Sequence, residues 1–219
     1  MKPKYYITTA IAYVNGKPHM GHALEFLQAD FVARYHRLKG EDVYFLTGSD
    51  EHGQKIVDTA KQQGMSTREL VDRNAKIFMN FTELLNLSND DFIRTSDQKK
   101  HWPSVVRLWN ILKDKGDIYK KQYEGLYCVG CEKFMTKKEL DKSGNCPVHE
   151  KAPNIIKEEN YFFNLSKYAS KVKELIEKDK FKVVPKTRKN EILSFLSGKV
   201  EDISFSRSKK ALQWGVPVP

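Results

Sequence analysis

Several features that mark common protein classes are absent from this chain of 219 residues. It contains no GxGxxG fingerprint and no Walker loop, so the two most familiar phosphate-binding loops are excluded. No run of about 18 apolar residues occurs, so no transmembrane helix is expected. The N-terminus lacks the apolar core and cleavage site of a secretory signal. Internal repeats and low-complexity linkers are also missing. We therefore expect a cytoplasmic protein with no membrane partner.

Cysteine is scarce, and its placement is informative. The only three cysteines are Cys128, Cys131 and Cys146, and an odd, clustered set argues against a disulfide framework. Two residues separate Cys128 from Cys131, fourteen follow, and two separate Cys146 from His149. Four such ligands on two tight turns can close a tetrahedral Zn²⁺ shell with no open position, which predicts a structural zinc site. The alternative is three buried or free cysteines beside a surface histidine.

Charge of one sign is in excess, with 38 Lys and Arg against 28 Asp and Glu and a formal net charge of +10. A basic surface attracts polyanions such as nucleic acids. The alternative is that the excess of basic residues reflects only a lysine-rich, solvated surface without a partner. Hydrophobic residues make up 40% and charged residues 30%, an ordinary globular balance. The length suits one sizeable core, or one domain with a smaller insertion.

The first 50 residues read as a strand, a helix and a second strand. Residues 4–9 are apolar and β-prone, residues 20–39 have helical periodicity, and residues 43–47 form a short apolar run. The expected buried face of the helix is Leu24, Leu27, Phe31, Tyr35 and Leu38. Such a unit predicts a parallel sheet, whose helix N-terminus can hold phosphate because its first N–H groups are unpaired.

The pattern continues and then changes near Gly116. Ser66 and Glu69 predict a capping box, residues 91–95 a third strand, and residues 97–115 a helix. After residue 116 the chain reads as a hairpin arm, a cysteine-bearing loop and a strand over residues 160–165. Ser166 and Thr187 are expected to cap two further helices, and residues 202–206 read as a strand. The fold class predicted is α/β with an insertion.

Two pairs of polar residues lie in the segments that follow the first two predicted strands. His19 and His22 flank Gly21 at the helix start, where imidazoles can donate to phosphate oxygens. They can also be ordinary surface or core histidines, and no third ligand is apparent for a metal. Asp50 and Glu51 follow the second strand and suit recognition of an ammonium group. The alternative is a solvated N-cap for the next helix.

Together these stretches resemble the methionyl-tRNA synthetase family of class I aminoacyl-tRNA synthetases. The segment AYVNGKPHMGH, residues 12–22, is similar to its HIGH signature region, and TGSDEHG, residues 47–53, to its second conserved block. The segments GLYCVGCEKF and CPVHE resemble its zinc knuckle, and DISFSRSKKALQWGVPVP also looks like the family. The similarity covers essentially the whole chain, with the motifs in the family's order.

The resemblance implies roles for individual residues. His19, Gly21 and His22 would bind ATP, used with Mg²⁺, and the two histidines would be catalytic. Ala10, Ile11, Tyr13 and Asp50 would form the methionine site, with Asp50 facing the α-amino group. The implied reaction activates L-methionine to methionyl-adenylate and then transfers it to the 3′ end of methionine tRNA. The residues whose roles are implied are His19, Gly21, His22, Ala10, Ile11, Tyr13 and Asp50.

The resemblance also implies an organisation. Residues 1–115 would be the first half of a Rossmann-like catalytic domain, 116–212 a connective-peptide insertion with the zinc knuckle, and 213–219 the return to the catalytic domain. The family continues with a KMSKS loop and an anticodon-binding domain, and no KMSKS-like run occurs here. We therefore expect a piece that is inactive alone and works with a C-terminal remainder or second subunit.

Two other interpretations stay open from the sequence. One is a non-catalytic zinc-containing module that binds tRNA or a partner subunit. The other is a different nucleotidyl transferase, or a synthetase for another amino acid, although the residue 47–53 block and the cysteine spacing speak against it.

Overall fold

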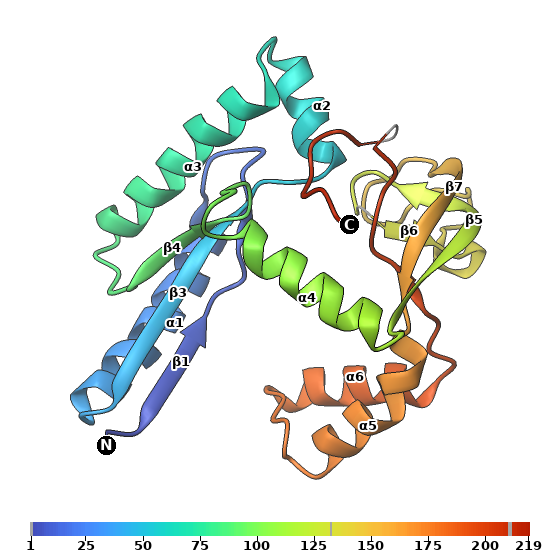
Figure 1. The fold of residues 1–219 in the computed structure, drawn as a ribbon. Coiled ribbons are helices and arrows are strands. Elements are labelled where there is room, and N and C mark those ends of the chain that lie inside the picture. Colours follow the sequence, from blue (N-terminus) through green and yellow to red (C-terminus); the bar gives the residue numbers. More distant parts are fainter. Residues whose placement is uncertain (1, 132, 210–211) are drawn as a thin grey trace. The chain divides into compact units, whose positions relative to one another are not determined.

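The computed structural model describes residues 2–131, 133–209 and 212–219, which form two compact units. The first unit is Met1–Leu108 together with Leu212–Pro219, and the second is Trp109–Ala211 (Figure 1). The domain boundaries expected from the sequence lie after residues 115 and 212, and that division into domains stays a prediction. None of the helices in the described residues is long and apolar enough to cross a membrane.

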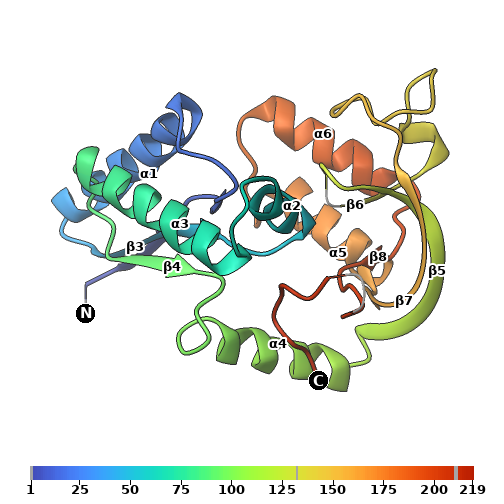
Figure 2. The ribbon, with the colours of Figure 1, turned by 90° about the horizontal axis from the view of Figure 1, so that it is seen from above.

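The first unit is a parallel sheet with helices, so the predicted α/β class is confirmed. Its elements are β1 (Lys4–Thr8), β2 (Ala12–Tyr13), α1 (Met20–Leu38), β3 (Asp42–Asp50), α2 (Gln54–Gln62), α3 (Thr67–Leu84) and β4 (Asp91–Arg94). The next helix, α4 (Trp102–Asp114), contains the division between the units. Helices α1 and α3 cover the same face of the sheet (Figure 2).

The central strand of this sheet is β3, and every pairing is parallel. Leu46 is the register partner of both Thr8 and Asp91, so β1 and β4 lie on opposite edges of β3. Ser49 pairs with both Ala12 and Arg94, which places β2 on the β1 side. Because all the strands run in the same direction, their carboxyl ends meet at one edge, where open α/β sheets bind ligands.

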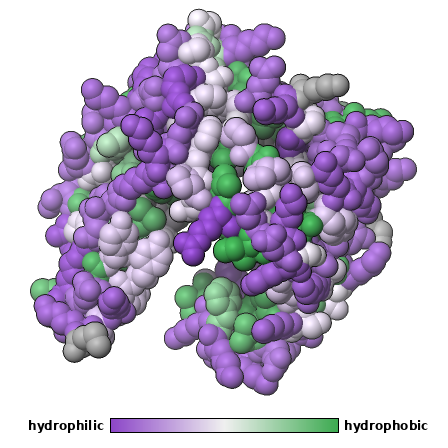
Figure 3. Space-filling model, viewed as in Figure 1, coloured by the Kyte–Doolittle hydropathy of each residue, from purple (hydrophilic) through white to green (hydrophobic). Residues whose placement is uncertain are grey.

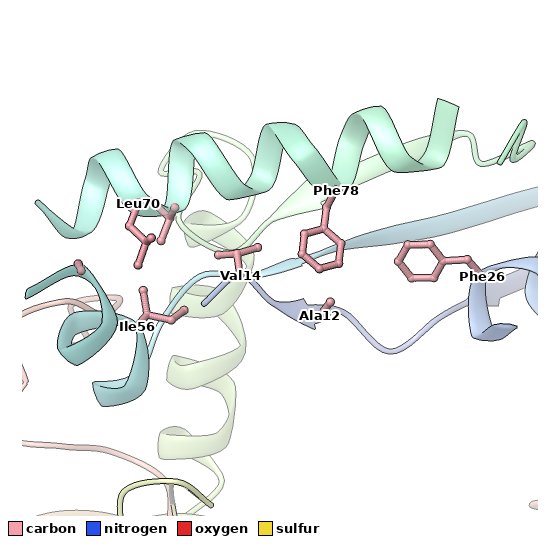
Figure 4. Packing of buried hydrophobic residues seen from close by; sticks show 8 residues of the cluster. Ala12, Val14, Phe26, Ile56, Leu70 and Phe78 are labelled. Atoms are coloured by element: carbon pink, nitrogen blue, oxygen red, sulfur yellow. The ribbon is translucent and has the colours of Figure 1, made fainter. Parts of the chain in front are cut away.

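The core of the first unit lies between the sheet and the helices above it. Phe78 and Leu70 of α3 point toward Val14, which follows β2, and Ile56 of α2 closes the other side (Figure 4). The buried members are Ala12, Val14, Phe26, Ile56, Ala60, Leu70, Val71 and Phe78. The Asn74 side chain donates a buried 2.7 Å hydrogen bond to the Val14 carbonyl, which fixes the start of the loop before α1 against α3.

The predicted buried face of α1 is wrong. Leu24, Leu27, Phe31, Tyr35 and Leu38 are all exposed, and Ala23, Phe26, Asp30 and Ala33 are buried instead. Both sets repeat at helical spacing, so periodicity alone could not choose between them. The two alanines present little side chain on the buried face, where α1 covers the sheet. Asp30 is buried because its carboxylate accepts hydrogen bonds from Arg34 and from the Ser88 backbone and hydroxyl.

The second unit is an antiparallel sheet followed by helices. Its elements are β5 (Ile118–Cys128), β6 (Lys133–Met135), a 3₁₀ turn η1 (Lys137–Glu139), β7 (Asn154–Phe163), α5 (Leu165–Glu177), α6 (Lys186–Ser197) and β8 (Ile203–Ser204). The strand order is β6-β5-β7-β8. Cys128, the last residue of β5, pairs with Lys133 of β6, so the first cysteine lies at the end of this strand pair. Hydrophilic residues dominate the face of the molecule seen in Figure 3.

Several predicted element boundaries are corrected. Helix α4 starts at Trp102 rather than near residue 97, because Asp97 instead accepts the backbone N–H groups of Lys99 and Lys100 in a turn. The predicted strand at 160–165 begins at Asn154 and ends at Phe163, since its long pairing with β5 extends it backwards. The strand expected over residues 202–206 is limited to Ile203–Ser204.

Two predicted helix caps are also wrong, and one is confirmed. Ser166 lies inside α5, whose N-cap is Asn164, and the Ser166 backbone N–H donates to Asp202 instead. Thr187 lies inside α6, which begins after Pro185. The capping box of Ser66 and Glu69 is present, with both reciprocal hydrogen bonds. Its two partners lie three residues apart in the sequence as a serine and a glutamate, and that made it readable.

Candidate functional site

The two histidines predicted from the sequence form a reciprocal cap at the start of α1. His19 is the N-cap residue, and its Nδ1 accepts the Gly21 backbone N–H at 3.1 Å. The Nδ1 of His22 accepts the His19 backbone N–H at 3.2 Å. The rings lie 3.9 Å apart between centroids. Because both Nδ1 atoms accept, each neutral ring carries its proton on Nε2 and can donate from there to an anion.

The His19 ring lies so close to position 21 that it favours glycine there. A Cβ atom at position 21 would lie 2.9 Å from His19 Cε1 and 3.1 Å from its Nδ1. The expectation that the first helical N–H groups are unpaired is corrected at this point, since the Gly21 N–H is held by His19. Any phosphate at this helix start would therefore meet imidazole Nε2–H groups rather than the Gly21 backbone.

His22 is held between a polar and an apolar neighbour. Its ring meets the Phe78 ring edge-on at 5.2 Å between centroids. Burial, and then the adjacent His19, lower the pKa of His22, against a smaller opposing effect of Glu25. The neutral form is therefore favoured, which agrees with a ring that accepts at Nδ1 and donates at Nε2.

The residues expected around the amino acid lie at the carboxyl edge of the sheet. Ala10 and Ile11 are in the loop between β1 and β2, and the Ala10 N–H donates to Glu25 of α1 at 2.7 Å. Tyr13 on β2 is the register partner of Asp50 at the end of β3. The Asp50 carbonyl also accepts the Val14 N–H at 3.3 Å. The sheet thus brings Tyr13 and Asp50 together, although they are far apart in sequence.

Of the two adjacent acids, only Asp50 is partly accessible. Glu51 is fully buried, and its carboxylate accepts hydrogen bonds from Ser49, Arg94 and Ser96. The expectation that Asp50 and Glu51 together suit an external ammonium is therefore wrong for Glu51, whose charge is already paired with a guanidinium inside the protein. Apart from Ser49 on β3, its partners come from β4 and the turn after it, which local sequence could not indicate.

His52 and Trp214 lie beside this edge. The Trp214 Nε1–H donates to the Glu51 carbonyl at 2.5 Å, and the Trp214 ring lies 5.9 Å from the His52 ring between centroids. The Arg68 guanidinium stands over the Trp214 ring at 4.9 Å. Burial lowers the pKa of His52 to about 4. This imidazole is therefore neutral at pH 7 and adds no charge beside Asp50.

The four predicted metal ligands converge in the second unit. Their ligand atoms, three Sγ and the Nδ1 of His149, all lie within 4.8 Å of one another. Cys131 Sγ is 3.3 Å from His149 Nδ1 and 3.5 Å from Cys146 Sγ, and His149 Nδ1 is 3.8 Å from Cys128 Sγ. Ligands of a tetrahedral Zn²⁺ stand about 3.5–3.8 Å apart, given bond lengths of about 2.0–2.3 Å. The cluster is therefore compatible with zinc.

The surroundings of the cluster fit a bound cation. A Cβ atom at Gly130 would lie 2.3 Å from His149 Cδ2, so only glycine lets the ring reach the two cysteines of the first turn. The Cys131 backbone N–H points at Cys128 Sγ at 3.4 Å. Burial and the two neighbouring cysteines raise the pKa of Cys131 to about 12. A Zn²⁺ bound by this cluster would lower that pKa, because cysteine binds zinc as the thiolate.

Sequence reasoning missed four residues that shape the sheet edge. Glu25, Arg94 and Trp214 contact the segments that carry the predicted site, and Arg68 stands over the Trp214 ring. Arg94 could have been found from the sequence, because it lies near the end of the strand predicted over residues 91–95 and so belongs to the same carboxyl edge. Glu25 follows His22 by three residues on the helix. Nothing local marks Arg68 or Trp214, since their importance depends on a contact between distant segments.

Comparison with known proteins identifies relatives. The family model of class I tRNA synthetases (M) matches residues 5–152 and 142–219. A methionine–tRNA ligase of Brucella suis is 44% identical over all of this chain, which covers 42% of that protein. The corresponding protein of Fusobacterium nucleatum is 41% identical, with 34% of its length covered. The chain thus spans less than half the length of these curated relatives.

Solved structures agree with the sequence comparison. A Mycobacterium tuberculosis methionyl-tRNA synthetase in complex with methionyl-adenylate is 41% identical, with a TM-score of 0.93. The apo form of that synthetase has a TM-score of 0.79 at 38% identity. All of this chain is covered in both, against 43% and 42% of those chains.

Proposed function

This chain belongs to the class I tRNA synthetase (M) family, and from this premise we propose that it serves the ATP-dependent activation of methionine and its transfer to methionine tRNA. The relatives are methionine–tRNA ligases, and one related structure holds methionyl-adenylate. The single observation that carries the proposal is the reciprocal cap of His19 and His22, which occupies both Nδ1 atoms and so puts the proton of each neutral ring on Nε2 at the start of α1.

ATP binds at the start of α1 in this proposal. The Nε2–H groups of His19 and His22 donate to phosphate oxygens, because both Nδ1 atoms are occupied by backbone N–H groups. Gly21 keeps the first turn free of a side chain beside the His19 ring. Donors fixed in advance stabilise the charge that develops on a pentacoordinate phosphorus, and no reorganisation is needed when the reaction occurs. Mg²⁺, when bound with ATP, would neutralise phosphate charge.

Methionine binds at the ends of β2 and β3. Asp50 faces the α-ammonium group, and Tyr13, its register partner, lines the same site. Ala10 and Ile11 contribute from the loop between β1 and β2. The neutral His52 nearby adds no positive charge that would compete with the ammonium group.

The chemistry needs no nucleophile from the protein. A carboxylate oxygen of methionine attacks the α-phosphorus of ATP, the bond to the bridging oxygen breaks, and pyrophosphate leaves. A hydroxyl of the 3′-terminal adenosine of the tRNA then attacks the methionyl carbonyl and releases AMP. The protein's contribution is positioning and charge stabilisation.

The second unit supports this reaction without catalysing it. Cys128, Cys131, Cys146 and His149 hold a structural Zn²⁺, which fastens the loop from the β5–β6 hairpin to His149. The segment 109–211 contains 23 of the 38 Lys and Arg residues but 15 of the 28 Asp and Glu residues. Most of the net positive charge therefore lies in this unit, which suits contact with tRNA phosphates. We place the reaction in the cytoplasm, where protein synthesis consumes its product.

The same charge distribution favours one alternative, a non-catalytic zinc-containing module that binds tRNA or a partner subunit. Methionine-dependent ATP–pyrophosphate exchange separates the two functions, measured at native length and on this chain with the C-terminal part of a relative added in trans. Exchange that His19→Ala abolishes supports the synthetase. Absence of exchange, with tRNA binding intact and both pieces folded, supports the module. Exchange stimulated by another amino acid in place of methionine would overturn the methionine assignment.

A further inference from the structure

Glu51 is a buried acidic side chain, paired with an arginine, at the edge of the proposed methionine site. Its carboxylate is fully buried, and Arg94 donates to both oxygens, from Nε at 2.7 Å and from a terminal nitrogen at 3.0 Å. The Ser49 hydroxyl donates to Oε1 at 2.6 Å, and the Ser96 hydroxyl donates to Oε2. This bidentate arrangement allows only one orientation of the carboxylate.

The backbone of Glu51 is fixed as firmly as its side chain. Its N–H donates to the Thr95 hydroxyl at 2.8 Å, and its carbonyl accepts the Trp214 indole N–H. The peptide bond on each side of Glu51 is therefore held by a different segment, one after β4 and one near residue 214. Asp50 shares the first of these peptide bonds.

Arg94 extends the network to α3. Its terminal nitrogen that bonds Glu51 also donates to Asp72 at 2.6 Å. Hydrogen bonds from Glu51 and Asp72 raise the pKa of Arg94 despite partial burial. The guanidinium thus joins the ends of β3 and β4 to the helix that covers the sheet.

A buried ion pair of this kind is weak evidence for stability, because the cost of removing both charges from water offsets most of their attraction. What it does provide is a defined geometry. The segment whose geometry it defines is the end of β3 at Asp50, where the Asp50 carbonyl accepts the N–H of Val14, the residue after β2. We propose that Glu51 and Arg94 are positioning residues, which hold the Asp50 carboxylate where it meets the ammonium group of the amino-acid substrate. This inference rests on the proposed function.

The test measures methionine-dependent ATP–pyrophosphate exchange in the protein at native length. Glu51→Gln keeps the shape of the side chain and removes its charge. We expect the KM for methionine to rise about tenfold or more, as for a group displaced by a fraction of an ångström, while the KM for ATP changes less than about twofold. Inhibition by a methionine analogue that lacks the amino group should be unchanged, because that ligand does not use Asp50.

Two further variants separate positioning from a general loss of structure. Asp50→Asn should raise the KM for methionine, and adding Glu51→Gln to it should raise that KM little more, since both changes affect one contact. Asp30→Asn breaks another buried carboxylate network of the first unit, with Arg34 and Ser88. It should lower the melting temperature and leave the KM for methionine unchanged.

The outcomes are distinct. If the unaltered protein shows no methionine-dependent exchange, the proposed function fails and this inference with it. If it shows exchange, but Glu51→Gln weakens methionine and the desamino analogue equally, or adds fully to Asp50→Asn, the inference alone is overturned. If Glu51→Gln does not fold, Arg94→Lys is the second variant, because lysine keeps the charge and loses the bidentate fork. It should give the same methionine-specific loss, and a normal KM for methionine in that variant contradicts the inference.

Discussion

The His19 side chain accepts the backbone N–H of Gly21, while the His22 side chain accepts the backbone N–H of His19. The two residues therefore close a capping box that usually consists of a serine or threonine and a glutamate. Its consequence is chemical as well as structural. Each ring is held through Nδ1, and the opposite nitrogen of each ring is left to donate outward.

The first prediction separates the capping role of His19 from its proposed catalytic role. His19→Ala removes both, so it should cost about 0.5–2 kcal/mol of stability and lower kcat about 10²–10³-fold. His19→Asn supplies a good N-cap oxygen but no donor in the position of Nε2, so stability should be kept and activity lost. Denaturant unfolding and pyrophosphate exchange measure the two effects. Full activity of His19→Asn would mean that His19 only caps the helix.

The second prediction concerns the metal cluster. We expect one zinc per chain by elemental analysis. Gly130→Ala should lose it, because the new methyl group would overlap the His149 ring at 2.3 Å. Gly198→Ala is the matched control, since its nearest neighbour, the Phe195 carbonyl oxygen, would be at 3.5 Å. Less than about a tenth of an equivalent of zinc in the folded unaltered protein contradicts the assignment of these ligands.

Removal of the metal should act locally, and this forms the third prediction. A chelator should abolish amide-exchange protection in residues 128–149, because three cysteines and His149 hold that loop together. The amides of β3 belong to the first unit, so their protection should persist. Equal loss of protection in both segments would show that the zinc loop and the parallel sheet unfold as one unit.

The fourth prediction tests which face of α1 is buried. Phe26 is 1% exposed and Phe31 is 74% exposed, although both are phenylalanines on the same helix. Phe26→Ala should destabilise the first unit by about 3–5 kcal/mol. Phe31→Ala should change stability by less than about 0.5 kcal/mol. Urea unfolding of the two variants compares them directly, and equal destabilisation would contradict the observed orientation of the helix.

The fifth prediction is a pH dependence that originates at His52. Burial lowers its pKa to about 4 in the folded protein, against about 6.5 in an unfolded chain. Between these values the unfolded state binds the proton and the folded state does not, so stability should fall as the pH falls from about 6.5 to 4. His52→Gln should flatten this part of the profile. An NMR titration midpoint of His52 near 6.5 would contradict the burial effect.

Local sequence determined the features whose partners are close together in the chain. The capping box of Ser66 and Glu69 spans three residues, as does the cap formed by His19 and His22, so helix geometry alone brings the groups together. The zinc ligands occupy two short turns, and their spacing predicted a cluster that the structure contains. The alternation of strand and helix was likewise enough for the α/β class.

Only the tertiary structure decided the features that depend on distant partners. Helix α1 offers two sets of residues at helical spacing, and contact with the rest of the first unit selects the one with Phe26, Asp30 and two alanines. Glu51 meets Arg94 across 43 positions and Trp214 across 163. A carboxylate has the same chemistry whether it binds a substrate or an internal guanidinium. Its role therefore depends on which distant residues the tertiary structure brings next to it.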